Sequence, residues 1–128
     1  MEIILKKKVI INQEDIDDIM VTALEGGITY WCYGAQSIMP DEWMRENKIE
    51  YLSDVTGRGG DIVLTTEDGD FILTLQAFYN GLQQLIDESG EYYIESTSDG
   101  LKIDTSEIDA DIADLIIQYA LFGKLVYA

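Results

Sequence analysis

Three stretches of this chain repeat apolar residues at steps of three and four, which is the spacing of one face of a helix. Each stretch follows a residue type that caps helix N-termini, and each ends at glycine. The pattern therefore predicts three helices. They cover residues 13–25 after Asn12, residues 75–89 after Thr74, and the residues up to 122 after a cap at Thr105 or Ser106.

Short runs rich in β-branched and aromatic residues predict strands around these helices. The turns Asp68-Gly69 and Ser98-Asp99-Gly100 join such runs in the way typical of β-hairpins. The chain opens with an apolar run over residues 2–11, interrupted by Lys6-Lys7-Lys8, that predicts a lysine-protected edge strand or strand pair. Residues 124–127 are expected to form a closing strand beside it. The predicted class is α+β, with about three helices packed on a small antiparallel sheet of hairpins.

The segment between the first helix and the first hairpin has weaker patterns. Residues 28–33 are densely aromatic, and we expect a second helical piece there that continues past Gly26-Gly27. Residues 34–47 contain the only proline and predict a loop in which Met39, Trp43 and Met44 are exposed. A short helix is expected over residues 48–55.

The composition is strongly acidic. The chain has 128 residues, with 25 acidic and 8 basic side chains, no histidine and a net charge of −17, while 47% of it is hydrophobic. That hydrophobic fraction suffices for a core, so we expect a single folded domain over residues 1–128. The absence of histidine and the single cysteine exclude histidine-dependent hydrolysis and zinc sites. We expect no enzyme activity, no catalytic residues, no metal site and no cofactor.

The sign of the charge limits the partners. A chain of −17 is repelled by DNA, RNA and anionic membranes, which are bound through Lys and Arg, and is attracted to basic protein surfaces. The N-terminus lacks the order of a secretory signal, and no apolar run reaches the roughly 18 residues of a membrane span. With one free cysteine, Cys32, a cytoplasmic location is expected.

Six acidic residues form two rows on the predicted helices. Their spacings of three, four and seven place each row on one helical face, opposite the apolar residues. Three interpretations stay open: a soluble acidic surface, a row of carboxylates that imitates nucleic-acid phosphates, or a weak divalent-cation site, although no calcium-loop pattern is present. Under the second, neutralising Asp111 and Asp114 is expected to weaken binding and leave the fold intact. The candidate partner-binding residues are Glu14, Asp18, Glu25, Glu107, Asp111 and Asp114.

Two further features favour structural roles. The glycine-rich run at residues 57–60 lacks the Lys-Ser/Thr of a phosphate-binding P-loop, so a structural turn is favoured over a phosphate site. Cys32 lies between Trp31 and Tyr33 with no basic neighbour in sequence, which favours a buried small apolar residue over a nucleophile.

Two blocks of the chain resemble a family of small acidic proteins encoded by phages and prophages of Firmicutes. The blocks are Ile28-Thr29-Tyr30-Trp31-Cys32 and Gln118-Tyr119-Ala120-Leu121-Phe122-Gly123. The likeness begins at residue 14, spans nearly the whole chain, and is weakest over residues 34–50. Between the two blocks it continues through Ser53-Asp54-Val55, Arg58-Gly59-Gly60, Leu73-Thr74-Leu75 and Asp109-Ala110.

The resemblance carries no established activity for the family as a whole, but small, acidic phage proteins without catalytic residues are often antagonists of host defence. It therefore implies a non-enzymatic inhibitor of a bacterial defence protein, of the anti-CRISPR type, in the cytoplasm of the infected host. Its acidic surface would occupy the basic nucleic-acid site of an effector nuclease. The alternative is a phage accessory or structural module that contacts its partner through Met39, Trp43 and Met44. A nucleotide sponge is disfavoured because Arg58 alone supplies little positive charge.

Overall fold

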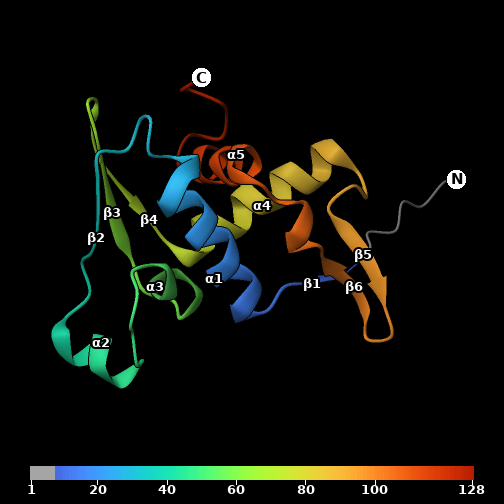
Figure 1. The fold of residues 1–128 in the computed structure, drawn as a ribbon, viewed down its shortest axis with the longest axis horizontal. Helices are drawn as coiled ribbons and strands as arrows, with labels where there is room; N and C mark the ends of the chain where they lie inside the picture. The colour runs from blue at the N-terminus through green and yellow to red at the C-terminus, as the bar shows by residue number, and fades with distance from the viewer. Residues whose placement is uncertain (1–7) are drawn as a thin grey trace, which may run out of the picture.

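The structure of the protein, a computed structural model, describes residues 8–128 and shows an α+β fold with two small sheets (Figure 1). In the first sheet, β1 (Val9–Ile10) pairs parallel with β6 (Gly100–Ile103), which pairs antiparallel with β5 (Ile94–Thr97). The second sheet is antiparallel, in the order β2 (Gly34–Ser37), β3 (Ile62–Thr66) and β4 (Gly69–Leu73). The α+β class and both hairpins are confirmed, whereas the single antiparallel sheet is wrong. Residues 2–7 of the predicted opening strand, with Lys6 and Lys7, lie outside the described residues.

Three long helices lie between the two sheets (Figure 1). They are α1 (Gln13–Thr22), α4 (Leu75–Ser89) and α5 (Ala110–Phe122). Their apolar faces meet in one core, in which Ile19, Phe78 and Ile116 are fully buried. Because each sheet covers a different side of this helical layer, the two hairpins do not join into one sheet.

The predicted first helix is confirmed, including its cap. Asn12 Oδ1 accepts from the Asp15 backbone N–H at 2.9 Å, and the Asp15 carboxylate accepts from the Asn12 N–H at 3.1 Å. The helix continues as a π-helix, η1 (Ala23–Gly27), which ends when the Ile28 N–H donates to Ala23 O. Residues 28–31 then form turns, so the second helical piece expected there is wrong.

Residues 34–57 are more regular than the expected loop. They contain β2 and two short helices, α2 (Asp41–Glu46) and α3 (Ser53–Gly57), the second of which begins later than predicted. Met39, Trp43 and Met44 are half-buried against the core and not exposed as expected. The Trp43 ring lies so close to Gly60 that a Cβ on that glycine would meet ring carbon Cη2 at 2.5 Å.

The C-terminal elements correct two expectations. Thr105 and Ser106 belong to a short 3₁₀ turn, η2 (Thr105–Glu107), and α5 begins later because Asp109 accepts from the Ile112 N–H at 3.0 Å. The helix ends as predicted at Gly123, whose φ of 71° is left-handed. The residues after it form no strand; instead they fold back on α5.

Candidate functional site

The two acidic rows come from elements that lie side by side. The π-helix η1 packs directly on the start of α5, because a Cβ on Gly27 would lie 2.5 Å from the Ala110 carbonyl oxygen. One turn away, α1 and η2 share a cleft lined by Asp18 on one side and Ser106 on the other. The tertiary structure therefore brings the elements that carry the two rows into contact.

Five of the six candidate residues are exposed on these contacting elements. We call them the acidic seam, and they are Glu14, Asp18, Glu25, Glu107 and Asp111. None of the four elements that carry the seam contains a lysine or arginine. The seam is therefore a surface of one charge sign, which repels anions and attracts cationic side chains.

The sixth candidate, Asp114, does not belong to the seam. It is only 7% exposed, so its expected place in a solvent-facing row is wrong. Its carboxylate accepts three hydrogen bonds, from Tyr30 Oη at 2.6 Å, Trp31 Nε1 at 2.7 Å and Gln118 Nε2 at 2.9 Å. A buried carboxylate with this set of donors is a structural anchor that no partner can reach.

This anchor also holds the C-terminal tail. Gln118 is fully buried, and its Oε1 accepts from the N–H groups of Val126 and Tyr127, both at 2.8 Å. The Tyr127 ring then stacks on Trp31 with a centroid distance of 5.0 Å. Burial and the bond to Asp114 raise the pKa of the Tyr30 hydroxyl to about 12, so this hydroxyl stays protonated as a donor.

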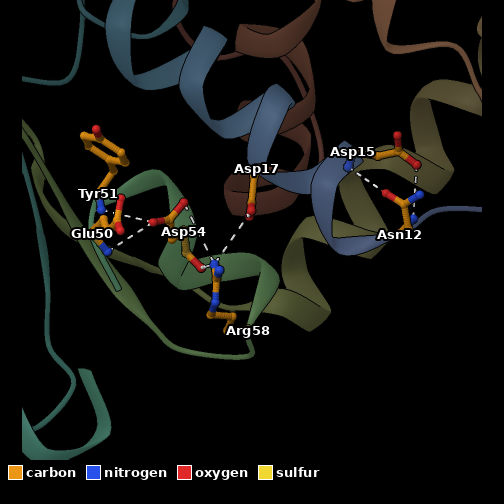
Figure 2. A network of polar contacts seen from close by, with 7 residues as sticks. All are labelled: Asn12, Asp15, Asp17, Glu50, Tyr51, Asp54 and Arg58. Carbon is orange, nitrogen blue, oxygen red and sulfur yellow. Dashed lines mark hydrogen bonds and ion pairs between the residues drawn. The ribbon is translucent and has the colours of Figure 1, made fainter. Parts of the chain in front are cut away.

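A second polar network lies at the N-terminal half of α1 and contains Arg58 (Figure 2). Arg58 Nη1 lies 3.7 Å from Asp17 Oδ2 and 3.9 Å from Asp54 Oδ1, and donates to the Asp54 carbonyl at 3.0 Å. With its amide oxygen turned toward Arg58, Gln13 accepts from Nε at 3.0 Å. Among residues 8–128, these are the ion pairs that form. The Arg58 guanidinium is thus paired with Asp17 and Asp54, which are not seam residues.

Asp17 in this network is poorly compensated. Its Oδ1 is buried without a hydrogen-bond partner, and burial raises the pKa of its carboxyl, opposed by the Arg58 guanidinium. Asp54, Asp18 and Glu14 raise the same pKa further because they carry like charges. Asp17 is therefore a local source of electrostatic strain.

The glycine-rich run at residues 57–60 is a structural turn. The N–H groups of Arg58 and Gly60 donate to Val55 O, and that of Gly59 donates to Thr56 O. No row of free N–H groups remains to hold a phosphate, and the Arg58 side chain is engaged by acids. The nucleotide-sponge hypothesis loses its site for this reason.

Cys32 behaves as expected of a buried apolar residue. It is 9% exposed, its Sγ donates to the Gly34 carbonyl at 3.2 Å, and burial raises the pKa of the thiol. A raised pKa leaves less thiolate at neutral pH, so the side chain is a poor nucleophile.

Two hollows mark the surface of the described residues. A groove of about 590 Å³ lies between α4 and the first sheet, with mainly apolar walls that include Val9, Leu82 and Ile86. The cleft between α1 and η2, about 360 Å³, has mixed walls and lies within the seam. Sequence reasoning missed this cleft because its two sides are more than 80 residues apart; the only local signal is the Thr105-Ser106 pair beside acids.

Within residues 8–128, no three His, Cys, Asp or Glu side chains gather in a way that would hold a metal ion. The helices of this part of the chain are all too short or too polar to cross a membrane. No family model matches the chain, and neither a curated protein nor a solved structure does.

Proposed function

We propose that this protein is a non-enzymatic, phage-encoded inhibitor that binds a basic, nucleic-acid-binding surface of a bacterial defence protein. The observation that carries the proposal is the acidic seam, in which five exposed carboxylates lie on contacting elements that contain no basic residue. The resemblance to acidic phage proteins directs the proposal to CRISPR effector nucleases in the cytoplasm of the infected host.

The physical basis is replacement of phosphates by carboxylates. An RNA-guided nuclease holds its heteroduplex in a positively charged channel and reads the adjacent motif with arginines. Carboxylates carried on contacting helices would meet the same cations that otherwise bind the nucleic-acid backbone. Like-charge neighbours on a helix cost a few tenths of a kcal/mol per pair, so the seam is a feature that stability alone does not favour.

The chemistry of the remaining residues supports a binding role. The chain has no histidine, and its single thiol is buried with a raised pKa. Asp114, the one buried carboxylate of the six candidates, is saturated by three donors. The many surface carboxylates suit electrostatic recognition of a basic partner.

The test is displacement of labelled target DNA from a panel of purified RNA-guided nucleases, at low and high salt. We expect displacement to weaken as salt rises, because the contacts are between surface charges. The seam-neutral variant carries four substitutions: Glu14→Gln, Asp18→Asn, Glu25→Gln and Asp111→Asn. The concentration of this variant that displaces half of the DNA is expected to be roughly tenfold or more higher than that of the parent protein.

A matched control removes the same charge from exposed acids outside the seam: Glu42→Gln, Glu46→Gln, Asp70→Asn and Asp99→Asn. The concentration of this control that displaces half of the DNA is expected to stay within about twofold of the value for the parent protein. Equal losses in the two variants would mean that only net charge matters, and failure to displace DNA from every nuclease of the panel would overturn the proposal.

A further inference from the structure

The cleft between α1 and η2 lies in the middle of the acidic seam. Its walls are formed by Asp18, Val21 and Thr22 of α1 on one side and by Thr105 and Ser106 of η2 on the other, and Ile19 and Ile108 complete it. Ile19 and Ile108 are almost fully buried, so they form an apolar floor. The volume, about 360 Å³, lies near the lower end of the range for ligand pockets and accommodates one large side chain.

The polar groups of the cleft are mainly hydrogen-bond acceptors. The Thr22 hydroxyl already donates its proton to the Asp18 carbonyl at 3.1 Å, and the Ser106 hydroxyl donates to Asp104 Oδ1 at 2.5 Å. Each hydroxyl has one proton, so both oxygens are left with acceptor capacity only. Asp18 adds the single carboxylate of the cleft, and it forms no ion pair with the described residues.

We infer that this cleft binds an arginine side chain of the partner. The guanidinium has five donors and no acceptor, which matches walls that supply Asp18, Thr22 and Ser106 as acceptors. Its planar, weakly hydrated faces and its methylene stem suit the apolar floor of Ile19 and Ile108. A lysine ammonium is more strongly hydrated and lacks the flat face, so it fits the same cleft less well.

This inference rests on the proposed function in one respect, that the partner surface is basic, and it names the side chain that enters the seam. In this scheme the surrounding seam residues attract the partner at long range, and the cleft makes one specific contact with it. The two roles separate in measurements, because attraction depends on total charge whereas cleft binding depends on the shape and acceptors of one site.

The direct test is an NMR titration of the ¹⁵N-labelled protein with N-acetyl-arginine-N-methylamide as the probe. The matched probes are the lysine analogue and the citrulline analogue, in which the guanidinium is replaced by a neutral urea of the same shape. We expect saturable shifts at Asp18, Val21, Thr22, Ser106 and Ile108 with the arginine probe, at a Kd on the order of a millimolar. The lysine probe is expected to bind more weakly, and the citrulline probe not to saturate.

Two variants test the site itself. Asp18→Asn removes the carboxylate and is expected to weaken the arginine probe about fivefold or more. Ser106→Met keeps the net charge and places a longer side chain at the cleft. It is expected to weaken binding of the arginine probe by a similar factor. Glu14→Gln, one turn before Asp18 and outside the cleft, is the charge-matched control and is expected to change binding by less than about twofold.

The outcomes separate this inference from the proposed function. Shifts of equal size with the citrulline probe, or binding unchanged in both Asp18→Asn and Ser106→Met, overturn the arginine cleft. If the seam-neutral variant still loses nuclease inhibition in that case, the proposed function stands without the cleft. Saturable arginine binding in a protein that inhibits no nuclease would leave the cleft and remove the proposed function.

Discussion

Asp111 and Asp114 lie three residues apart on α5 and have opposite environments. Asp111 is exposed on the seam, while Asp114 is buried among three donors. Helix α5 carries apolar residues on most of its circumference, so the sequence pattern defines its buried face poorly. Two of the three donors, Tyr30 and Trp31, lie more than 80 residues away in the sequence, so the local pattern does not reveal them.

The expectation that both residues can be neutralised without harm to the fold is therefore revised. We predict that Asp114→Asn lowers the free energy of unfolding by about 2 kcal/mol, because the amide replaces a charged acceptor and adds donors that face Tyr30 Oη and Trp31 Nε1. Urea denaturation followed by circular dichroism measures this change. Asp111→Asn is the control and is expected to stay within about 0.5 kcal/mol of the parent; equal effects would mean that the hydrogen bonds to Asp114 are dispensable.

Helices α4 and α5 pack backbone against backbone. A Cβ on Gly81 of α4 would lie 2.5 Å from the Ile116 carbonyl oxygen and 2.7 Å from the Ala120 nitrogen. Neither atom belongs to a flexible side chain, so the helices must move apart to admit a methyl group. At this point the fold requires glycine for close approach rather than for a left-handed backbone.

We predict that Gly81→Ala destabilises the protein by about 2 kcal/mol, although alanine is the better helix former by about 1 kcal/mol. Thermal unfolding measures the effect. Gly26→Ala is the matched control, because no atom lies within 4 Å of the position of its Cβ. That variant is expected to be neutral or slightly more stable; a stabilising Gly81→Ala would contradict the close packing of α4 and α5.

At the scale of the whole molecule, self-repulsion follows from a net charge of −17. Arg58 supplies the ion pairs between described residues, and its partners Asp17 and Asp54 are only two of the acids. The seam and most other carboxylates are balanced by solvent ions rather than by protein cations. Stability should therefore respond to conditions that screen or protonate carboxylates.

We predict that the melting temperature rises when salt is added at pH 7, because screening weakens repulsion between carboxylates. We also predict a rise as pH is lowered from 7 toward the folded pKa of the Asp17 carboxyl. Asp17 has a folded pKa raised above 3.8, so it binds protons more tightly in the folded state. Its contribution to stability is present at low pH and is lost as pH rises through the folded pKa. Thermal melts over a grid of pH and NaCl measure both effects.

Asp17→Asn replaces the titrating carboxyl by a neutral amide, and its melting temperature is measured over the same grid of pH and NaCl. It is expected to reduce the pH-dependent rise and to leave most of the salt effect, which comes from the other acids. A melting temperature that is flat or falling with salt at pH 7 would show that the carboxylates are too far apart to repel, and the seam would lose its electrostatic basis.

Local sequence patterns account for most of the secondary-structure elements and for the charge. The Asn12 and Thr74 caps, the two hairpin turns and the Gly123 stop were all predicted and are all present. Each depends on hydrogen bonds or backbone preferences within a few residues, which sequence displays directly. The wrong cap at Thr105 or Ser106 shows the limit of such local patterns. Asp109, three or four residues further along, is also a good capping residue, and it is the one that caps α5.

How these elements combine depends on contacts between distant parts of the chain. The tertiary structure separated the hairpins into two sheets, paired β1 with β6 in parallel, and placed Met39, Trp43 and Met44 against the core. It also brought the elements that carry the five seam acids into contact, buried Asp114, and formed the cleft between α1 and η2. Each of these results joins segments far apart in the chain, where packing and the satisfaction of buried polar groups act on the whole molecule and local pattern carries no information.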